Sequence, residues 1–401
     1  MKRREFLGAA LAAPLAAAEE KKVIPWYEEP MLNLHSKVKN PVKIESIDLI
    51  RVGKEYFVRS RSTDGATGLC RTKQMEDYIA IFERRVVPLL IGKDARDIET
   101  LVDDVYTANY KLAGQPFWCP VAYVEQSLFD LLGKSSGKRV AELLGGVVRE
   151  DIPVYLSGSG RDTTAEQEVD VYVRGLAETG ANAMKFKIGG RMSRNLDAYP
   201  GRTETMLKLA RKKMGDKIVI NADANGSYNA AKAIEVGRMM EDLGVNFFEE
   251  PCPWEELGET KKVADTLKMK VAIGEQDASL WRFLWICENQ VAQIVQPDLN
   301  YCGGFVRALR VARIARKFDM PIVPHNTQTG STAVNILQFA AAVPNIGTHM
   351  EFPHRGNEKP EPWSSPNFAI KNGKVAAPKG PGLGVEFDPS FIAKGVRATA
   401  S

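Results

Sequence analysis

The sequence predicts an α/β protein built around a closed parallel barrel, with a smaller α+β module before it. From residue 152 onward, eight short apolar or β-branched runs alternate with segments of helical periodicity. Such alternation is typical of parallel strands joined by helices, and eight units favour a closed barrel. The chain of 401 residues is long enough for a barrel of roughly 200 to 250 residues and a second module.

The eight strand candidates lie at residues 153–157, 183–187, 217–223, 246–249, 270–275, 293–298, 320–325 and 347–351. The segments between them, such as residues 230–243 and 305–318, place apolar residues at helical spacing. Residues 152–354 are therefore predicted to form the barrel.

The first 151 residues divide into three parts. Residues 1–18 join a basic start with adjacent arginines to a short apolar run and small residues. This pattern predicts a twin-arginine-type signal peptide, and hence export, most simply to the periplasm, with no membrane span in the mature form. A basic, frayed helix is the alternative. Residues 19–41, which contain three prolines, are expected to form an N-terminal arm.

Residues 42–151 are expected to form the α+β module. Residues 42–52 and 56–61 alternate as strands, Ser62-Thr63-Asp64-Gly65 is a turn signal, and residues 76–90 and 121–132 have helical spacing. Residues 355–401 lose all periodicity and are rich in Pro and Gly, so we expect a tail that packs back on this module.

Composition excludes several functions. A net charge of +4 with scattered basic residues gives no reason to expect nucleic acid. The five cysteines are odd in number and widely spaced, which argues against a disulfide framework or a structural zinc site.

Ionisable residues stand at or near the ends of seven of the predicted strands. They are Lys187, Asp223, Glu249, Glu275, Asp298, His325 and Glu351. The carboxyl ends of barrel strands share one face, where barrel enzymes hold their catalytic groups. One such residue alone would more often be a helix cap or a surface charge, so the inference depends on the ordered set.

Three of these residues, Asp223, Glu249 and Glu275, follow one another at intervals of 26 residues. Three adjacent carboxylates repel each other unless a cation lies between them. Oxygen ligands suit Mg²⁺ better than zinc. Bound Mg²⁺ would polarise a substrate carboxylate as a Lewis acid.

The remaining residues suggest acid–base chemistry. Lys185 and Lys187 lie two apart on one strand and so share a face. Two ammonium groups lower each other's pKa, which would make one of them a base at neutral pH. Asp298 is expected to orient His325 from the adjacent strand. The set suits removal of a proton α to a carboxylate, with an enediolate intermediate, although Lys-x-Lys alone is also common on exposed edge strands.

The sequence resembles the enolase superfamily, in its mandelate racemase subgroup, over residues 42–389. The matching motifs are Lys185-Phe186-Lys187, Asn221-Ala222-Asp223-Ala224-Asn225, Phe248-Glu249-Glu250-Pro251, Ile273-Gly274-Glu275, Pro297-Asp298 with Gly303-Gly304, Pro324-His325 and Glu351. Residues 130–134, 143–146 and 380–384 resemble the family's capping domain and tail.

The resemblance implies a modified TIM barrel, (β/α)₇β, at residues 152–354, with residues 42–151 as an α+β capping domain whose loops close the pocket. It implies Asp223, Glu249 and Glu275 as Mg²⁺ ligands, and Lys187 and His325–Asp298 as acid–base groups on opposite sides. Lys185, Asn225 and Glu351 would contact the substrate, with Lys185 tuning Lys187 and Glu351 acting as a protonated acid. It also implies a homo-oligomer.

The resemblance leaves the reaction open. The branch that uses a lysine at the end of the sixth strand is excluded, because Asp298 stands there. An acid-sugar dehydratase is favoured. The alternatives are a racemase or epimerase of a 2-hydroxy acid and an inactive exported sugar-acid-binding protein.

Substrate specificity is expected to lie in loops near residues 53–68 and after Lys187. Arg191, Arg194 and Arg202, with Tyr199, could cover a polyhydroxylated anion. A solvated basic loop is an equally good interpretation of these residues.

Overall fold

The computed structural model of the chain describes residues 23–73, 75–158, 160–354, 356 and 359–400. The expected signal peptide at residues 1–18, and the first residues of the arm, lie outside the described residues.

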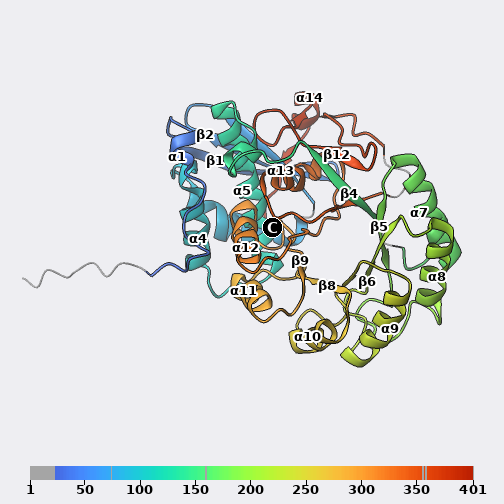
Figure 1. Cartoon of the computed structure of the whole chain (residues 1–401). Coiled ribbons are helices and arrows are strands. Elements are labelled where there is room, and N and C mark those ends of the chain that lie inside the picture. The colour runs from blue at the N-terminus through green and yellow to red at the C-terminus, as the bar shows by residue number, and fades with distance from the viewer. Residues whose placement is uncertain (1–22, 74, 159, 355, 357–358, 401) are drawn as a thin grey trace, which may run out of the picture.

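A ring of parallel strands forms the centre of the larger domain (Figure 1). The sheet has the order β10-β4-β5-β6-β7-β8-β9. Its strands are β4 (Asp151–Ser157), β5 (Ala183–Lys187), β6 (Val219–Asp223), β7 (Phe247–Glu249), β8 (Lys270–Ile273), β9 (Ile294–Val295) and β10 (Met350–Pro353). The α/β barrel predicted from the alternating pattern is therefore confirmed.

The seventh predicted strand, at residues 320–325, is reduced to a single bridging residue. Ile322 pairs with Val295 on one side and Ile346 on the other, which closes the ring. Pro321 and Pro324 cannot donate backbone hydrogen bonds, and this explains why the prediction of a full strand was wrong here.

Seven helices follow the strands and surround the ring, as Figure 1 shows for α7 to α10. They are α7 (Ala165–Thr179), α8 (Arg202–Met214), α9 (Ala230–Asp242), α10 (Leu257–Thr266), α11 (Leu280–Glu288), α12 (Phe305–Lys317) and α13 (Val334–Ala342). One residue from each of six ring positions fills the interior: Tyr155, Ala183, Phe247, Ala272, Ile294 and Val323. These apolar side chains pack beneath the polar site.

The capping domain is an antiparallel sheet covered by one long helix. The sheet contains β1 (Ile44–Val52), β2 (Glu55–Ser62) and β3 (Thr67–Thr72), of which β3 was not predicted. Helix α5 (Gln115–Ser136) packs on it so closely that a Cβ on Gly68 would lie 2.1 Å from the Ser127 carbonyl oxygen. Its other helices include α1 (Leu34–Lys37), α4 (Ile98–Ala108) and α6 (Val140–Leu143).

The helix expected at residues 76–90 is instead a series of short turns. A 3₁₀ turn (Glu76–Tyr78), α2 (Ile79–Ile81), a π-helical turn (Phe82–Val86) and α3 (Val87–Leu90) follow one another. Pro88 near the start of α3 has no backbone N–H, which is compatible with a break in the regular ladder.

The tail pairs with both domains. β12 (Lys374–Ala376) is antiparallel to β4, and β14 (Val396–Arg397) is antiparallel to β1. β11 (Ser364–Ser365) and β13 (Glu386–Phe387) pair with each other, and α14 (Pro389–Ile392) follows them. The expected packing on the capping domain is thus accompanied by pairing with the barrel.

A buried carboxylate joins the capping domain to the barrel. Glu125 on α5 accepts backbone N–H groups of Phe305 at 2.5 Å and Val306 at 2.8 Å, at the start of α12. Gly304 allows this approach, because a Cβ there would lie 2.0 Å from the carboxylate. The contact fixes the cap over the carboxyl ends of the strands.

Two further observations concern the described residues. All five cysteines are buried and free. No helix in the described part of the chain has the length and apolar character needed to cross a membrane.

Candidate active site

The register of neighbouring strands places the predicted site residues in one layer. Lys187 on β5 pairs with Asp223 on β6, and Asp223 pairs with Glu249 on β7. Glu275 follows two residues after the end of β8. The alignment of these strand ends brings together residues that lie far apart in the sequence.

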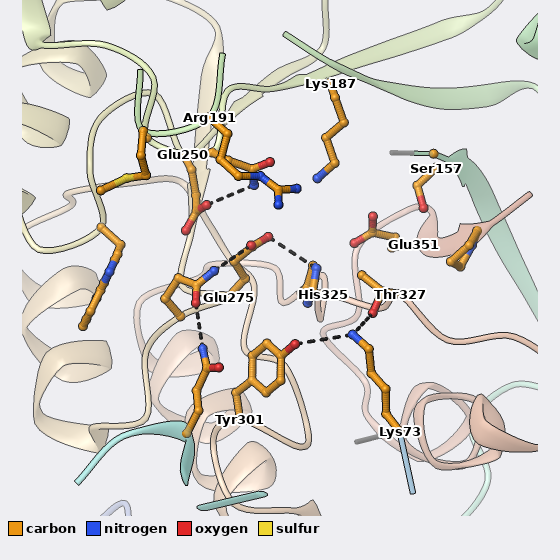
Figure 2. Close-up of a pocket in the computed structure, with 18 residues that line it drawn as sticks. Lys73, Ser157, Lys187, Arg191, Glu250, Glu275, Tyr301, His325, Thr327 and Glu351 are labelled. Atoms are coloured by element: carbon orange, nitrogen blue, oxygen red, sulfur yellow. Dashed lines mark hydrogen bonds and ion pairs between the residues drawn. The ribbon is translucent and has the colours of Figure 1, made fainter. Parts of the chain in front are cut away.

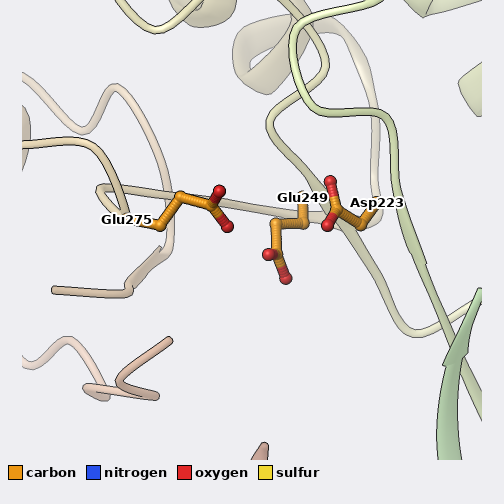
Figure 3. Close-up of side chains that lie close together, drawn as sticks. All are labelled: Asp223, Glu249 and Glu275. Carbon is orange, nitrogen blue, oxygen red and sulfur yellow. The ribbon is translucent and has the colours of Figure 1, made fainter. Parts of the chain in front are cut away.

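Asp223, Glu249 and Glu275 form a compact carboxylate cluster (Figure 3). One oxygen from each lies within 4.8 Å of the others, and all three side chains are buried. The Glu275 Oε2 atom is buried without a hydrogen-bond partner among the described residues. A buried carboxylate oxygen that accepts no hydrogen bond, within an all-oxygen donor set, fits a hard divalent cation.

The cluster is partly neutralised by Lys185, which is fully buried beneath the cavity. Its Nζ donates to both Glu249 oxygens at 2.7 Å and lies 2.9 Å from Glu351 Oε1. Burial, opposed by Lys185 and reinforced by Asp223, raises the pKa of Glu249 to about 8. For Asp223, burial is outweighed by Lys187 and Lys185, so its pKa is lowered.

The predicted pKa direction of the two lysines is wrong for this arrangement of side chains. Burial lowers the pKa of Lys185, but Glu249 and Glu351 outweigh it and raise the value well above normal. Burial likewise lowers the pKa of Lys187, whereas its ion pair with Asp223 leaves it raised. The prediction considered only lysine–lysine repulsion, and the surrounding carboxylates have the larger effect.

His325 is held by Asp298 as predicted. Its Nδ1 lies 2.9 Å from Asp298 Oδ2, and its Nε2 lies 3.5 Å from Glu275 Oε2. The backbone N–H groups of Asn300 and Tyr301 donate to Asp298 Oδ1, which orients the carboxylate. Burial lowers the pKa of His325, but Glu275 and Asp298 outweigh it and raise the value to about 10. The imidazole is therefore cationic in this arrangement.

Glu351 lies beside Lys185 and accepts the backbone N–H of Asn326 at 3.1 Å. Burial raises its pKa, but Lys185, His325 and Lys187 outweigh burial and lower it. This direction is opposite to the protonated state that the resemblance implies for Glu351.

A cavity of about 460 Å³ opens above these groups (Figure 2), within the usual size range for small-molecule sites. Five predicted residues line it: Lys187, Asn225, Glu275, His325 and Glu351. The other four are buried and do not line it: Lys185, Asp223, Glu249 and Asp298. The capping domain contributes Lys73 and Gln115.

Asn225, predicted to contact substrate, also hydrogen-bonds to the carboxylate cluster. Its Nδ2 donates to Asp223 Oδ2 at 3.2 Å and to Glu250 Oε2 at 3.3 Å, and its Oδ1 accepts from Arg161 at 3.0 Å. Sequence reasoning missed Arg161, which has no motif, and did not use Glu250, although that residue stands inside the Glu-Glu-Pro motif.

The prediction that the two specificity loops line the substrate site is only partly correct. None of residues 53–68 lines the cavity; β2 and β3 instead pack on α5. In the loop after Lys187, Arg191 reaches the cavity and Arg194 does not. Arg202 is fully buried and donates to backbone carbonyls of Lys187 and Gly160, so it supports the fold.

A chain of amide hydrogen bonds links the cap to the carboxylate cluster. Gln115 Nε2 donates to Gln276 Oε1 at 2.7 Å, and Gln276 Nε2 donates to Glu275 Oε1 at 2.9 Å. Sequence reasoning missed both glutamines. The capping domain is thus in hydrogen-bond contact with a predicted metal ligand.

Comparison with known proteins agrees with this architecture. Residues 168–391 match the enolase C-terminal domain-like family, and residues 35–145 match the mandelate racemase/muconate lactonizing enzyme N-terminal domain. Arabinonate dehydratase of Saccharolobus solfataricus is 29% identical over 75% of this chain and 79% of its own length. D-galactonate dehydratase of Variovorax paradoxus is 30% identical over 88% of this chain and 94% of its own.

Solved structures show the same fold. A candidate racemase from Roseobacter denitrificans has 33% identity and a TM-score of 0.84, covering 90% of this chain and 100% of that one. A mandelate racemase/muconate lactonizing protein from Paracoccus denitrificans, complexed with magnesium, has 27% identity and a TM-score of 0.80 with the same coverage. The chain therefore belongs to the mandelate racemase/muconate lactonizing enzyme family of the enolase superfamily, and is an enzyme of the dehydratase or racemase type.

Proposed function

We propose that this enzyme removes the α-proton of a sugar-acid carboxylate in a Mg²⁺-dependent reaction and then eliminates the β-hydroxyl as water. The observation that carries the proposal is the carboxylate cluster of Asp223, Glu249 and Glu275 beneath a cavity that also exposes Lys187 and His325. The named dehydratases among its relatives support the acid-sugar substrate class.

The three carboxylates would hold Mg²⁺, which when bound acts as a Lewis acid on the substrate carboxylate and makes the α-proton more acidic. Lys185 does not line the cavity, and its ammonium lies between Glu249 and Glu351, so it would hold these two carboxylates in place beneath the substrate. A cation on Asp223 would also weaken the ion pair that raises the pKa of Lys187.

The proton transfers are assigned to Lys187 and His325. Neutral Lys187 would take the α-proton at Nζ. Protonated His325 would give the proton on Nε2 to the departing β-hydroxyl, while Nδ1 stays bonded to Asp298. The electron pair of the broken C–H bond becomes the new C–C double bond, and the C–O bond electrons leave with water. The resulting enol tautomerises to a 2-keto acid.

A racemase or epimerase is the second candidate. The same two groups can serve it, because a proton removed by Lys187 could be returned by His325. The similarity to the candidate racemase from Roseobacter denitrificans supports this second candidate.

One experiment separates these reactions. The enzyme is incubated with Mg²⁺ and a library of acid sugars in D₂O, and each acid is followed by mass spectrometry. A mass decrease by one water supports dehydration. Uptake of deuterium without loss of water supports epimerisation. A protein that binds acids and changes none of them would refute the proposal.

We further propose, from the basic start with two arginines at Arg3 and Arg4, that the enzyme is exported to the periplasm. From its membership of the family, we also propose that it works as a homo-oligomer. Fractionation of cells making the native protein or its Arg3→Lys/Arg4→Lys variant tests the first part, since only the variant should stay in the cytoplasm. Light scattering on the purified enzyme tests the second, and a monomer mass would refute it.

A further inference from the structure

We infer that the substrate carries a second anionic group, and that Lys73, Thr327 and Tyr301 form the site that receives it. This inference rests on the proposed function and narrows its substrate class to dianionic acid sugars. The three residues are called the donor cluster below.

The donor cluster brings two domains together at the cavity wall. Lys73 follows β3 of the cap, while Tyr301 and Thr327 come from loops of the barrel. The Lys73 Nζ donates to Thr327 Oγ1 at 2.6 Å and lies 3.4 Å from Tyr301 OH (Figure 2). Its position is thus fixed by two hydroxyl groups, unlike that of an isolated surface lysine.

None of the carboxylates that the structure describes pairs with this ammonium. Within the described part of the chain, Lys73 makes no ion pair, whereas Lys185 and Lys187 pair with Glu249 and Asp223. Lys73 is also exposed, so a molecule in the cavity can reach it. The cavity therefore holds a positive charge that is not paired with the carboxylate cluster.

The two hydroxyls supply further donors. Each oxygen accepts from Lys73, and neither O–H has an acceptor among the described residues. Burial raises the pKa of Tyr301, so its hydroxyl keeps its proton. Among the described residues, the ammonium has only these two neutral hydroxyl oxygens as acceptors. An anion satisfies the ammonium and the two O–H groups better than a neutral hydroxyl does.

The donor cluster is separate from the groups assigned to the first carboxylate. Glu351 and the carboxylate cluster would serve that carboxylate from the barrel, while Lys73 comes from the cap. In Figure 2 the donor cluster lies on one side of His325, with Lys187 and Arg191 on the other. The donor cluster therefore lies on the opposite side of His325 from Lys187, the base assigned to the α-proton.

The second anion can be a terminal carboxylate, as in an aldaric acid, or a phosphate ester. The test uses hexonates (gluconate, galactonate and mannonate), the matching aldarates, and the matching 6-phosphohexonates, each with Mg²⁺. We measure kcat/KM for each acid and its binding by calorimetry. Preference for the aldarate or for the phosphate ester identifies the source of the charge, and either one supports the inference.

We expect the dianionic form to exceed its matching hexonate by about 10- to 100-fold in kcat/KM, the range of one charge-assisted hydrogen bond. Lys73→Met should remove this preference by lowering kcat/KM for the dianionic acids about 10- to 100-fold, and Lys73→Arg should keep it. Tyr301→Phe and Thr327→Val should each reduce it. Lys54→Met, at an exposed position outside the cavity, is the matched control and should change nothing.

A hexonate preferred over its dianionic partners, or a preference that survives Lys73→Met, would overturn this inference alone and leave the proposed function intact. Failure of all nine acids to bind or react would instead overturn the proposed function, and this inference with it.

Discussion

Removal of the buried Lys185 ammonium should destabilise the enzyme strongly, and Mg²⁺ should restore part of the loss. Lys185 lies 2.7 Å from Glu249 and 2.9 Å from Glu351. At an effective dielectric constant of about 20, each pair attracts by about 6 kcal/mol when its carboxylate is ionised. Desolvation of the charges offsets most of this energy. Measured losses on removing one partner of a buried pair are about 3 to 5 kcal/mol.

The variant is Lys185→Met, which keeps the length of the side chain and removes its charge. We expect its melting temperature to fall on the order of 5 to 10 °C in EDTA. A cation in the carboxylate cluster would replace the lost positive charge. Saturating Mg²⁺ should therefore raise the melting temperature of the variant more than that of the wild type.

The matched control is Lys213→Met. Lys213 pairs with Asp170 at 2.6 Å, but both side chains are more than 40% exposed. Exposed ion pairs contribute about 0 to 1 kcal/mol, so its melting temperature should hardly change. A Lys185→Met variant as stable as this control, or one that gains no more from Mg²⁺ than the wild type, would refute our reasoning.

Three further changes test other parts of the molecule. His325→Asn should abolish turnover and leave Mg²⁺ affinity within about threefold by calorimetry; retained activity would refute its role as acid. Gln276→Leu removes the donor to Glu275 and should weaken Mg²⁺ binding about 10-fold, since partners of metal ligands typically contribute this much; unchanged affinity would contradict the link. Burial raises the pKa of Glu125 to about 8, so the folded state binds its proton more tightly than the unfolded state does. Stability should therefore fall from pH 5 to pH 8 in urea unfolding, and less steeply in Glu125→Gln; parallel curves for the two proteins would show that Glu125 does not titrate in this range.

The carboxylate cluster could be predicted from the sequence because its geometry depends on regular elements. Asp223, Glu249 and Glu275 stand at or just beyond successive strand ends, and the barrel brings such positions to one face. The same regularity located His325 and Asp298. The family resemblance then added roles to residues whose placement the spacing already indicated.

Contacts across elements could not be predicted in this way. The pKa directions of Lys185 and Lys187 depend on carboxylates from other strands, whose distances no spacing gives. Lys73 and Gln115 reach the site from a different domain, and they have no periodic signal. The residues that the sequence left undetected lie in irregular loops, such as Lys73, or at a helix start, as Gln115 does.

Strand pairing between the two ends of the chain has a consequence for biosynthesis. β14, at residues 396–397, lies beside β1, at residues 44–52. The first strand of the sheet to be synthesised therefore pairs with the last. During translation the outer edge of β1 has no neighbour from β14 and presents free backbone groups that other chains can pair with. The cap can gain its fourth strand only after the ribosome has made nearly the whole chain. A stop codon before residue 396 should therefore yield protein that aggregates more readily, even though every residue of the carboxylate cluster is present.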